Sequence, residues 1–168
     1  ETAVLMERSL SFSAKTAGKI VGGAEMDPRS AEQYRRLAAS LHQVQIERGI
    51  KKVMVASAVA GEGKTLTALN LAVTLSESYL RRVVLVDADL HTQSVAKEYG
   101  LENEAGLSEL ISGTATIEAV QHRTHARARG RAVIKGRFAG CQGRKGNRRA
   151  RHQHQLNVQI ASAEESLV

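Results

Sequence analysis

Apolar residues recur at steps of three and four between residues 30 and 48, which is the spacing of one face of an α-helix. The apolar positions are Tyr34, Leu37, Ala38, Leu41 and Val44. Pro28 precedes this stretch, Ser30 and Gln33 have the spacing of a capping box, and Gly49 follows as a stop signal. The pattern predicts an amphipathic helix that begins soon after Pro28 and ends before Gly49.

Two short apolar runs, residues 53–56 and 83–86, have the length and composition of buried strands. Residues 66–79 between them are helix-favouring and apolar on most sides, as expected of a helix packed on a sheet. A strand, a helix and a second strand joined in this way predict a right-handed parallel unit. The fold class is therefore α/β with a parallel sheet, and residues 106–113 add a short helix that ends at a glycine.

The pattern is weaker at both ends of the chain. Residues 1–27 hold three glycines and no sustained period, and we expect a loosely ordered lead-in. From about residue 122 the chain is rich in Arg, Gly, His and Gln, and no acidic residue occurs between Ala119 and Ala163. The three parts we predict are a lead-in (1–27), an incomplete α/β domain (28–121) and a poorly structured basic tail (122–168). Weak strand candidates in the tail are residues 132–134 and the alternating Leu156, Val158 and Ile160.

The net charge of +7 belongs to this tail. Residues 1–118 hold 13 Lys/Arg against 15 Asp/Glu, a balance of −2, whereas residues 119–168 hold 11 against 2, a balance of +9. The α/β domain is therefore not a basic nucleic-acid binder. The longest apolar runs are far too short for a transmembrane helix, no leader pattern opens the chain, and Cys141 has no second cysteine to pair with. These features predict a cytoplasmic protein.

The strongest motif is the segment AVAGEGKT at residues 58–65, which follows the first predicted strand and opens the helix. It matches the P-loop pattern GxxxxGK[ST] except that Ala58 replaces the first glycine. Two glycines let successive backbone amides point at phosphate oxygens, a lysine can meet the β- and γ-phosphates, and a hydroxyl can bind Mg²⁺. The alternative, an ordinary glycine turn, fits the strand–turn–helix context less well. The predicted nucleotide-binding residues are Ala60, Gly61, Glu62, Gly63, Lys64, Thr65 and Leu66.

Asp87 and Asp89 follow the second predicted strand, at the edge of an α/β sheet where ligands bind. Two carboxylates there could complete a Mg²⁺ shell and activate an attacking hydroxyl. Without the P-loop, a solvated turn at the end of a strand would be the better explanation of the two aspartates. The predicted metal ligands are Thr65, Asp87 and Asp89, and the predicted catalytic residues are Lys64, Asp87 and Asp89.

In combination these motifs resemble the bacterial tyrosine autokinases of capsular and exopolysaccharide loci, within the wider group of partition and septum-site ATPases. The segment DADL at residues 87–90 resembles the family's second Walker motif, called A-prime. Residues 32–37 (EQYRRL) resemble the helix that packs subunits of these kinases into a ring, and residues 106–113 resemble the family's glycine-leucine-serine helix. The resemblance covers roughly residues 27–121.

Several positions depart from the family pattern. Val59 replaces the signature lysine of partition ATPases, which favours the kinase branch, and Ala60 replaces a common proline. Ala38 replaces the second arginine of the ring helix, and residues 90–93 (LHTQ) replace the usual arginines and proline. No aspartate follows Asp89, so the family's Walker B motif is not found, and no tyrosine follows Tyr99.

The resemblance implies an ATP- and Mg²⁺-dependent protein-tyrosine kinase of exopolysaccharide or capsule biosynthesis, impaired because Walker B is missing. It also implies a membrane-embedded polysaccharide chain-length protein as partner, peripheral association with the inner membrane through that partner, and homo-oligomers formed through the Glu32–Arg35 helix. Nucleic acid is not an expected partner. The alternatives are a non-catalytic nucleotide-dependent binding module, a partition-type ATPase, or an unstable product without function.

Three explanations compete for residues 122–168. The segment could be a basic region that binds acidic partners, although Phe138 is its only aromatic residue. It could be an autonomous insert, or a sequence translated out of frame, which fits best with the abrupt change of composition where the family resemblance stops. Two histidine pairs, His122 with His125 and His152 with His154, lack a third ligand at a fixed spacing, so we assign no metal site to them.

Overall fold

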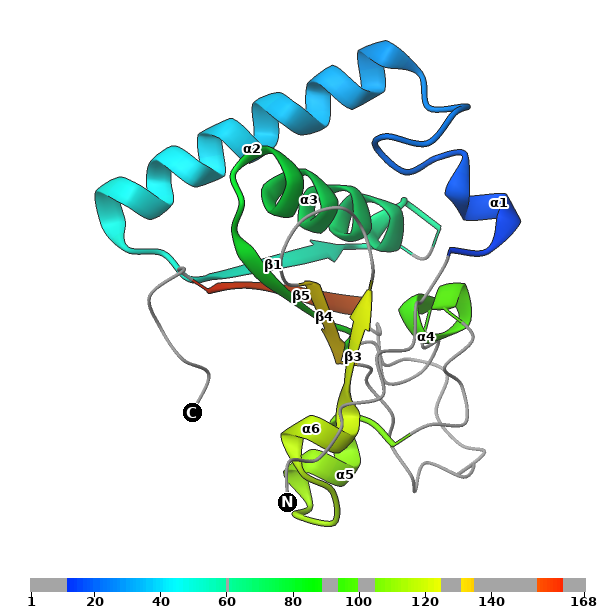
Figure 1. The fold of residues 1–168 in the computed structure, drawn as a ribbon, viewed down its shortest axis with the longest axis vertical. Helices are drawn as coiled ribbons and strands as arrows, with labels where there is room; N and C mark the ends of the chain where they lie inside the picture. Colours follow the sequence, from blue (N-terminus) through cyan, green and yellow to red (C-terminus); the bar gives the residue numbers. More distant parts are fainter. Residues whose placement is uncertain are drawn as a thin grey trace.

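A computed structural model describes residues 12–59, 61–88, 94–99, 105–124, 131–134 and 154–161. The helices are α1 (Ala14–Ala17), α2 (Pro28–Arg48), α3 (Lys64–Ser78), α4 (Ser94–Tyr99), α5 (Leu107–Ile111) and α6 (Ile117–Val120). The strands are β1 (Lys52–Ser57), β2 (Arg82–Val86), β3 (Gln121–Thr124), β4 (Arg131–Ile134) and β5 (His154–Ala161). Helix α3 packs on one face of the sheet and α2 packs on α3 (Figure 1). Among the described residues, no helix is long and apolar enough to cross a membrane.

The sheet is mixed, with the strand order β1-β5-β2-β4-β3. Strand β5 lies between β1 and β2 and is antiparallel to both, with Ser57 opposite His154 and Val86 opposite Asn157. Strands β1 and β2 therefore run in the same direction, as the sequence predicts, and β2 pairs in parallel with β4. The prediction of a purely parallel sheet is wrong, because β5 inserts between the two strands that α3 connects.

Strands β4 and β5 lie within the predicted poorly structured tail, and β3 begins one residue before it. Both weak strand candidates form strands, since residues 132–134 fall in β4 and the alternating apolar positions fall in β5. An alternating pattern can cover one face of a sheet, and the open edges of β1 and β2 supply hydrogen-bond partners for its backbone. For these strands the structure corrects the expectation of a poorly structured tail. The boundary at residue 122 stays a prediction.

The core forms between α3 and the sheet. Leu69, Leu71 and Leu75 of α3 are almost fully buried against Val83 and Leu85 of β2. The alternate side chain of β2, Val84, packs on the other face with Val120, so β2 is buried on both faces as predicted. Strand β1 corrects the prediction of a fully buried strand, because only alternate residues face the core and Met54 is 56% exposed. An edge strand with one covered face gives this pattern.

Helix α2 spans the predicted residues but begins with a different cap. The Asp27 carboxylate accepts a hydrogen bond from the Ser30 backbone N–H at 2.9 Å, and Pro28 occupies the first turn. The predicted capping box of Ser30 with Gln33 is therefore replaced by an Asp27 cap. At the other end Gly49 takes a left-handed conformation (φ 65°) and ends the helix, as predicted.

The segment 12–27 is anchored to the core by a buried amide. The Asn70 side chain accepts a hydrogen bond from the Val21 backbone N–H at 2.7 Å and donates to the Lys19 carbonyl at 3.1 Å. Asn70 is fully buried, and Ile20 is 5% exposed. The expectation of a loosely ordered lead-in is wrong for these residues, because Asn70 pairs with two of its backbone groups and Ser13 donates a backbone hydrogen bond to Glu98.

We expect removal of residues 122–168 to lower the stability of the chain strongly. The truncation would take away β5 and leave unpaired edges on β1 and β2 next to the core. Urea unfolding of the full chain and of residues 1–121 provides the comparison, with a lower midpoint for the truncated chain as the expected result. Equal midpoints would instead support the sequence-based expectation of a poorly structured tail.

Candidate functional site

The predicted P-loop connects the end of β1 to the first residue of α3. Gly61 (φ 86°) and Gly63 (φ 87°) both take left-handed conformations, which explains why glycine occupies these two positions. No atom lies within 4 Å of a Cβ placed on either glycine, so the backbone of the loop is open on this side. Gly63 directly precedes α3, whose first backbone N–H groups and helix dipole favour an anion. The loop geometry thus fits a phosphate group.

Lys64 lies at the base of the loop with only 9% of its surface exposed. Its Nζ donates a hydrogen bond to the Ser57 Oγ at 2.9 Å, and that hydroxyl donates to the Val59 carbonyl at 2.9 Å. The ammonium group is therefore held beside the carboxyl end of β1 by a neutral partner. Sequence reasoning missed Ser57, although its position as the last strand residue before the loop could have indicated it.

Glu62 contributes its carboxylate to the framework of the loop. Its Oε2 accepts a hydrogen bond from the Val59 backbone N–H at 3.1 Å. This bond lowers the pKa of Glu62 most, the Ser57 hydroxyl lowers it further, and the charge of Lys64 adds a smaller contribution. Glu62 is therefore ionised at neutral pH, and a negative charge lies beside the loop amides that a phosphate would approach.

The remaining predicted nucleotide-binding residues differ in what they can offer. Thr65 lies in the first turn of α3 and is partly buried. Leu66 packs its side chain against the core, so only its backbone N–H is available to a ligand. Ala60 lies outside the described residues.

Asp87 follows β2 and is fully buried. Its Oδ2 accepts a hydrogen bond from the Val95 backbone N–H at 3.0 Å, which caps the first turn of α4. Because β5 lies between β1 and β2, about 10 Å separates the strand that carries Asp87 from the strand that carries the P-loop. Lys64 and Asp87 lie beside the carboxyl ends of β1 and β2, with β5 between these two strands. Asp89 lies outside the described residues.

Three or more histidine, cysteine, aspartate or glutamate side chains that could share a metal ion do not gather anywhere in the described part of the chain. Of the predicted ligands, Thr65 and Asp87 are described and Asp89 is not. Of the histidine pairs, His125 and His152 also lie outside the described residues.

The ring-helix residues of α2 are exposed and paired with one another. The Glu32 carboxylate lies 3.7 Å from the Arg35 guanidinium and 3.2 Å from that of Arg36. Ala38, at the position of the family's second arginine, is fully buried. An arginine side chain would not fit there without displacement of the core. Of the ring motif that the resemblance implies, this stretch of α2 therefore keeps Glu32 and Arg35 and lacks the second arginine.

We expect Asp87→Ala to destabilise the fold by about 1–3 kcal/mol, because the buried Val95 N–H loses its acceptor. Asp87→Asn keeps a carbonyl acceptor and should cost less. Urea unfolding measures both, and Asp27→Ala gives the scale of an exposed helix cap. Equal losses for the two Asp87 variants would contradict the capping role.

The chain is similar to proteins that are named bacterial tyrosine-protein kinases. The chain is 39% identical over 101 residues to tyrosine-protein kinase YwqD of Bacillus subtilis (strain 168), which covers 58% of this chain and 42% of that protein. It is 31% identical over 94 residues to tyrosine-protein kinase etk of Escherichia coli (strain K12), covering 55% of this chain and 13% of that protein. It is 28% identical over 98 residues to tyrosine-protein kinase ptk of Acinetobacter johnsonii, with 58% and 13% covered. The chain spans less than half the length of each of these relatives.

The family match covers a larger share of the chain than the matches to these three relatives. Residues 53–160, more than half of the sequence, match the CobQ/CobB/MinD/ParA nucleotide binding domain. The matched stretch starts in β1, contains the P-loop, α3 and β2, and ends in β5. The chain therefore belongs to the CobQ/CobB/MinD/ParA family of nucleotide-binding domains and, over about 58% of its length, is similar to bacterial tyrosine-protein kinases.

Proposed function

We propose that the chain binds ATP with Mg²⁺ through the P-loop. The observation that carries the proposal is the open, left-handed loop at the N-terminus of α3 with Lys64 held at its base. The amides of Gly61 to Thr65 would bind phosphate oxygens, and the Lys64 ammonium would meet the β- and γ-phosphates. The Thr65 hydroxyl and the carboxylates of Asp87 and Asp89 are the side chains proposed to hold Mg²⁺, which would neutralise charge on the γ-phosphate.

We further propose that this site belongs to a protein-tyrosine kinase. The support is the similarity to relatives named tyrosine-protein kinases, together with the carboxylate at the end of β2. Asp87 would accept the proton of a tyrosine hydroxyl, and Lys64 would stabilise the transferring phosphoryl group. Because Asp87 is buried and caps α4, this role requires α4 to move away from the strand end when substrates bind.

Activity should be low, because the position between β1 and β2 carries an antiparallel strand. Strand β5 runs antiparallel to β1, so the carboxyl end of β5 lies at the far end of the strands from the P-loop. The first residue of β5, His154, pairs with Ser57, the last residue of β1. A carboxylate that follows a parallel strand there would point at the nucleotide, and no aspartate follows Asp89 in the sequence. Loss of a metal ligand or its hydrogen-bonding support lowers affinity or activity by about 10–100-fold.

The proposed setting is exopolysaccharide or capsule biosynthesis, with a membrane-embedded polysaccharide chain-length protein as activating partner and with the chain located in the cytoplasm or at the inner membrane. The exposed Glu32–Arg35 pair is the proposed contact between subunits of a homo-oligomer. Ala38 stands where the family has the second arginine of that contact, and the position is buried, so assembly should be weak.

A second candidate function is a nucleotide-dependent binding module or partition-type ATPase that transfers no phosphoryl group. The observation in its favour is that Gly61 and Gly63 of the P-loop both take left-handed conformations, while Asp87 is engaged in capping α4. The two candidates share ATP binding and differ in phosphoryl transfer, so binding and kinase measurements separate them.

We expect Lys64→Ala to weaken Mg²⁺–ATP binding at least about tenfold, since a charge-assisted hydrogen bond to phosphate is lost. Isothermal titration calorimetry on the purified chain measures the affinity. Lys19→Ala is the matched control, because Lys19 has an exposed side chain in the segment 12–27. An unchanged affinity for Lys64→Ala would contradict nucleotide binding by this loop.

We expect phosphotransfer to tyrosine to be about 10–100-fold slower than in an intact relative such as YwqD, although ATP still binds. Radiolabelled ATP followed by phosphotyrosine mass spectrometry, with and without the cytosolic tail of a cognate activator, gives the rate. Labelling of Tyr34, Tyr79 or Tyr99 at the relative's rate, abolished by Asp87→Asn, would contradict the impairment and support Asp87 as the catalytic base.

A further inference from the structure

The last turn of α4 is held by residues at the start of α1. The Glu98 carboxylate accepts a hydrogen bond from the Ser13 Oγ at 2.6 Å and another from the Thr16 Oγ1. The Glu98 backbone carbonyl accepts a third, from the Ser13 N–H at 3.1 Å. Thr16 and Glu98 lie 82 positions apart in the chain, so the junction is a tertiary contact. Hydrogen bonds donated to a carboxylate are among the stronger ones in proteins.

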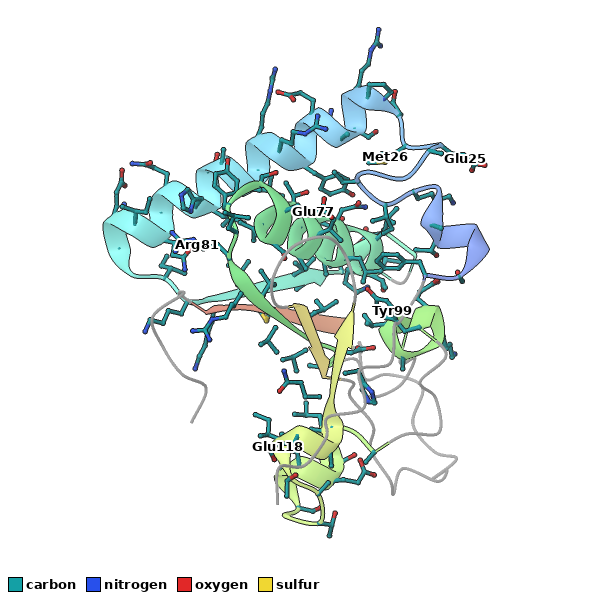
Figure 2. The ribbon with its side chains drawn as sticks, in the orientation of Figure 1. Glu25, Met26, Glu77, Arg81, Tyr99 and Glu118 are labelled. Carbon is teal, nitrogen blue, oxygen red and sulfur yellow. The ribbon has the colours of Figure 1, made fainter. Side chains whose placement is uncertain are left out.

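An aromatic contact supports the same junction. The Phe12 ring lies against the Tyr99 ring with the ring centroids 4.9 Å apart, and Figure 2 shows Tyr99 between α4 and α1. Phe12, Ser13 and Thr16 therefore form a clamp on α4. The segment that follows the clamp is fixed to α3, because the Asn70 side chain binds its backbone. The clamp thus ties α4 to the helix that begins at the P-loop.

The first turn of α4 is attached to Asp87. The Asp87 Oδ2 accepts the hydrogen bond from the Val95 N–H at 3.0 Å, and the side chains of Val95 and Ala96 are fully buried. A helix of six residues does not hold its place without contacts to the rest of the protein. The attachments at the two ends of α4 therefore depend on each other. While the clamp holds Glu98, the Val95 N–H stays at the Asp87 carboxylate.

We propose that the clamp is an autoinhibitory contact that acts through Glu98, a positioning residue, to keep Asp87 away from substrates. With the clamp closed, the Val95 N–H occupies an oxygen of the Asp87 carboxylate, and that carboxylate is fully buried. With the clamp open, α4 moves away from the end of β2, and the carboxylate becomes available to Mg²⁺ and to a tyrosine hydroxyl. The regulatory part of this proposal rests on the proposed function of Asp87.

The first measurement is hydrogen exchange of the Val95 amide, followed by NMR in the full chain. Glu98→Ala removes the acceptor of both hydroxyls, and we expect the Val95 amide to exchange at least about tenfold faster, because local opening of α4 then costs less. Glu98→Gln keeps a carbonyl acceptor and should restore most of the protection. Ser13→Ala combined with Thr16→Val removes the same two hydrogen bonds from the side of the clamp, so it should reproduce the effect of Glu98→Ala.

The second measurement is phosphotransfer to tyrosine by the same variants. We expect the rate to rise in Glu98→Ala by about the same factor as the exchange, since the open form of α4 is the minor, competent population. Loss of a merely structural contact would lower the rate or leave it unchanged, so a gain distinguishes the two roles. ATP affinity measured without Mg²⁺ should stay the same, because the P-loop binds phosphate without Asp87.

Lys97→Ala is the matched control, since it shortens an exposed side chain of the same helix. It should change the exchange and the rate by less than about twofold. Equal increases in exchange for Lys97→Ala and Glu98→Ala would overturn the proposal in favour of general fraying of α4.

Unchanged Val95 exchange in the Glu98→Ala variant and in the Ser13→Ala, Thr16→Val double variant, with ATP still bound, would overturn the clamp alone. Faster exchange with an unchanged or lower rate of phosphotransfer would overturn the autoinhibitory role. A parent chain that does not bind ATP would instead contradict the proposed function, so the two failures are distinguishable.

Discussion

The burial of α3 on nearly every side is the constraint on which the rest of the structure depends. The helix packs against β1, β5 and β2 on one side and against α2 on the other. Ten of its residues are buried, so its polar side chains depend on partners within the protein, and Ser76 Oγ finds none among the described residues. Asn70 finds them in the backbone of the segment 12–27, which fixes that segment to the helix. Because α3 packs between the sheet and α2, its first turn, which includes Lys64 and Thr65 of the P-loop, is tied to the core.

The electrostatics of the loop follow from the same burial. Lys64 begins a buried helix, so its ammonium group must be solvated by the protein, and the hydroxyl of Ser57 takes part of that role. Glu62 balances the charge from the exposed side of the loop while it accepts a hydrogen bond from Val59. A phosphate that enters the proposed site would compete with the Glu62 carboxylate for the positive field of the loop amides and Lys64. The loop is thus organised before ligand binding, at the expense of some of the attraction that an anion would otherwise gain.

Sequence reasoning predicted the features that depend on neighbouring residues. The ends of α2, the strands β1 and β2, α3 and the glycines of the P-loop all follow from local patterns and turn chemistry. The features it missed depend on residues far apart in the chain. The insertion of β5 between β1 and β2, the anchoring of residues 12–27 by Asn70 and the burial of Asp87 beneath α4 are set by tertiary contacts that no local period encodes. The Asp27 cap is an exception, since an Asp-Pro pair before a helix is a local signal that competed with Ser30.

The distinction between features set by neighbouring residues and features set by distant residues also separates the two steps of the proposed activity, phosphate binding and phosphoryl transfer. Phosphate binding needs a loop and a helix N-terminus, which residues 57–65 supply within one contiguous stretch that the packing of α3 holds in place. Phosphoryl transfer needs carboxylates at the ends of neighbouring strands, so it depends on the order and direction of the strands. Strand β5 is antiparallel to its neighbour β1, so the carboxyl end of β5 lies away from the P-loop. The nearest strand with its carboxyl end on the side of the P-loop is β2, which Asp87 follows. A change in the sheet can therefore remove catalysis from such a domain while the local phosphate site keeps its geometry.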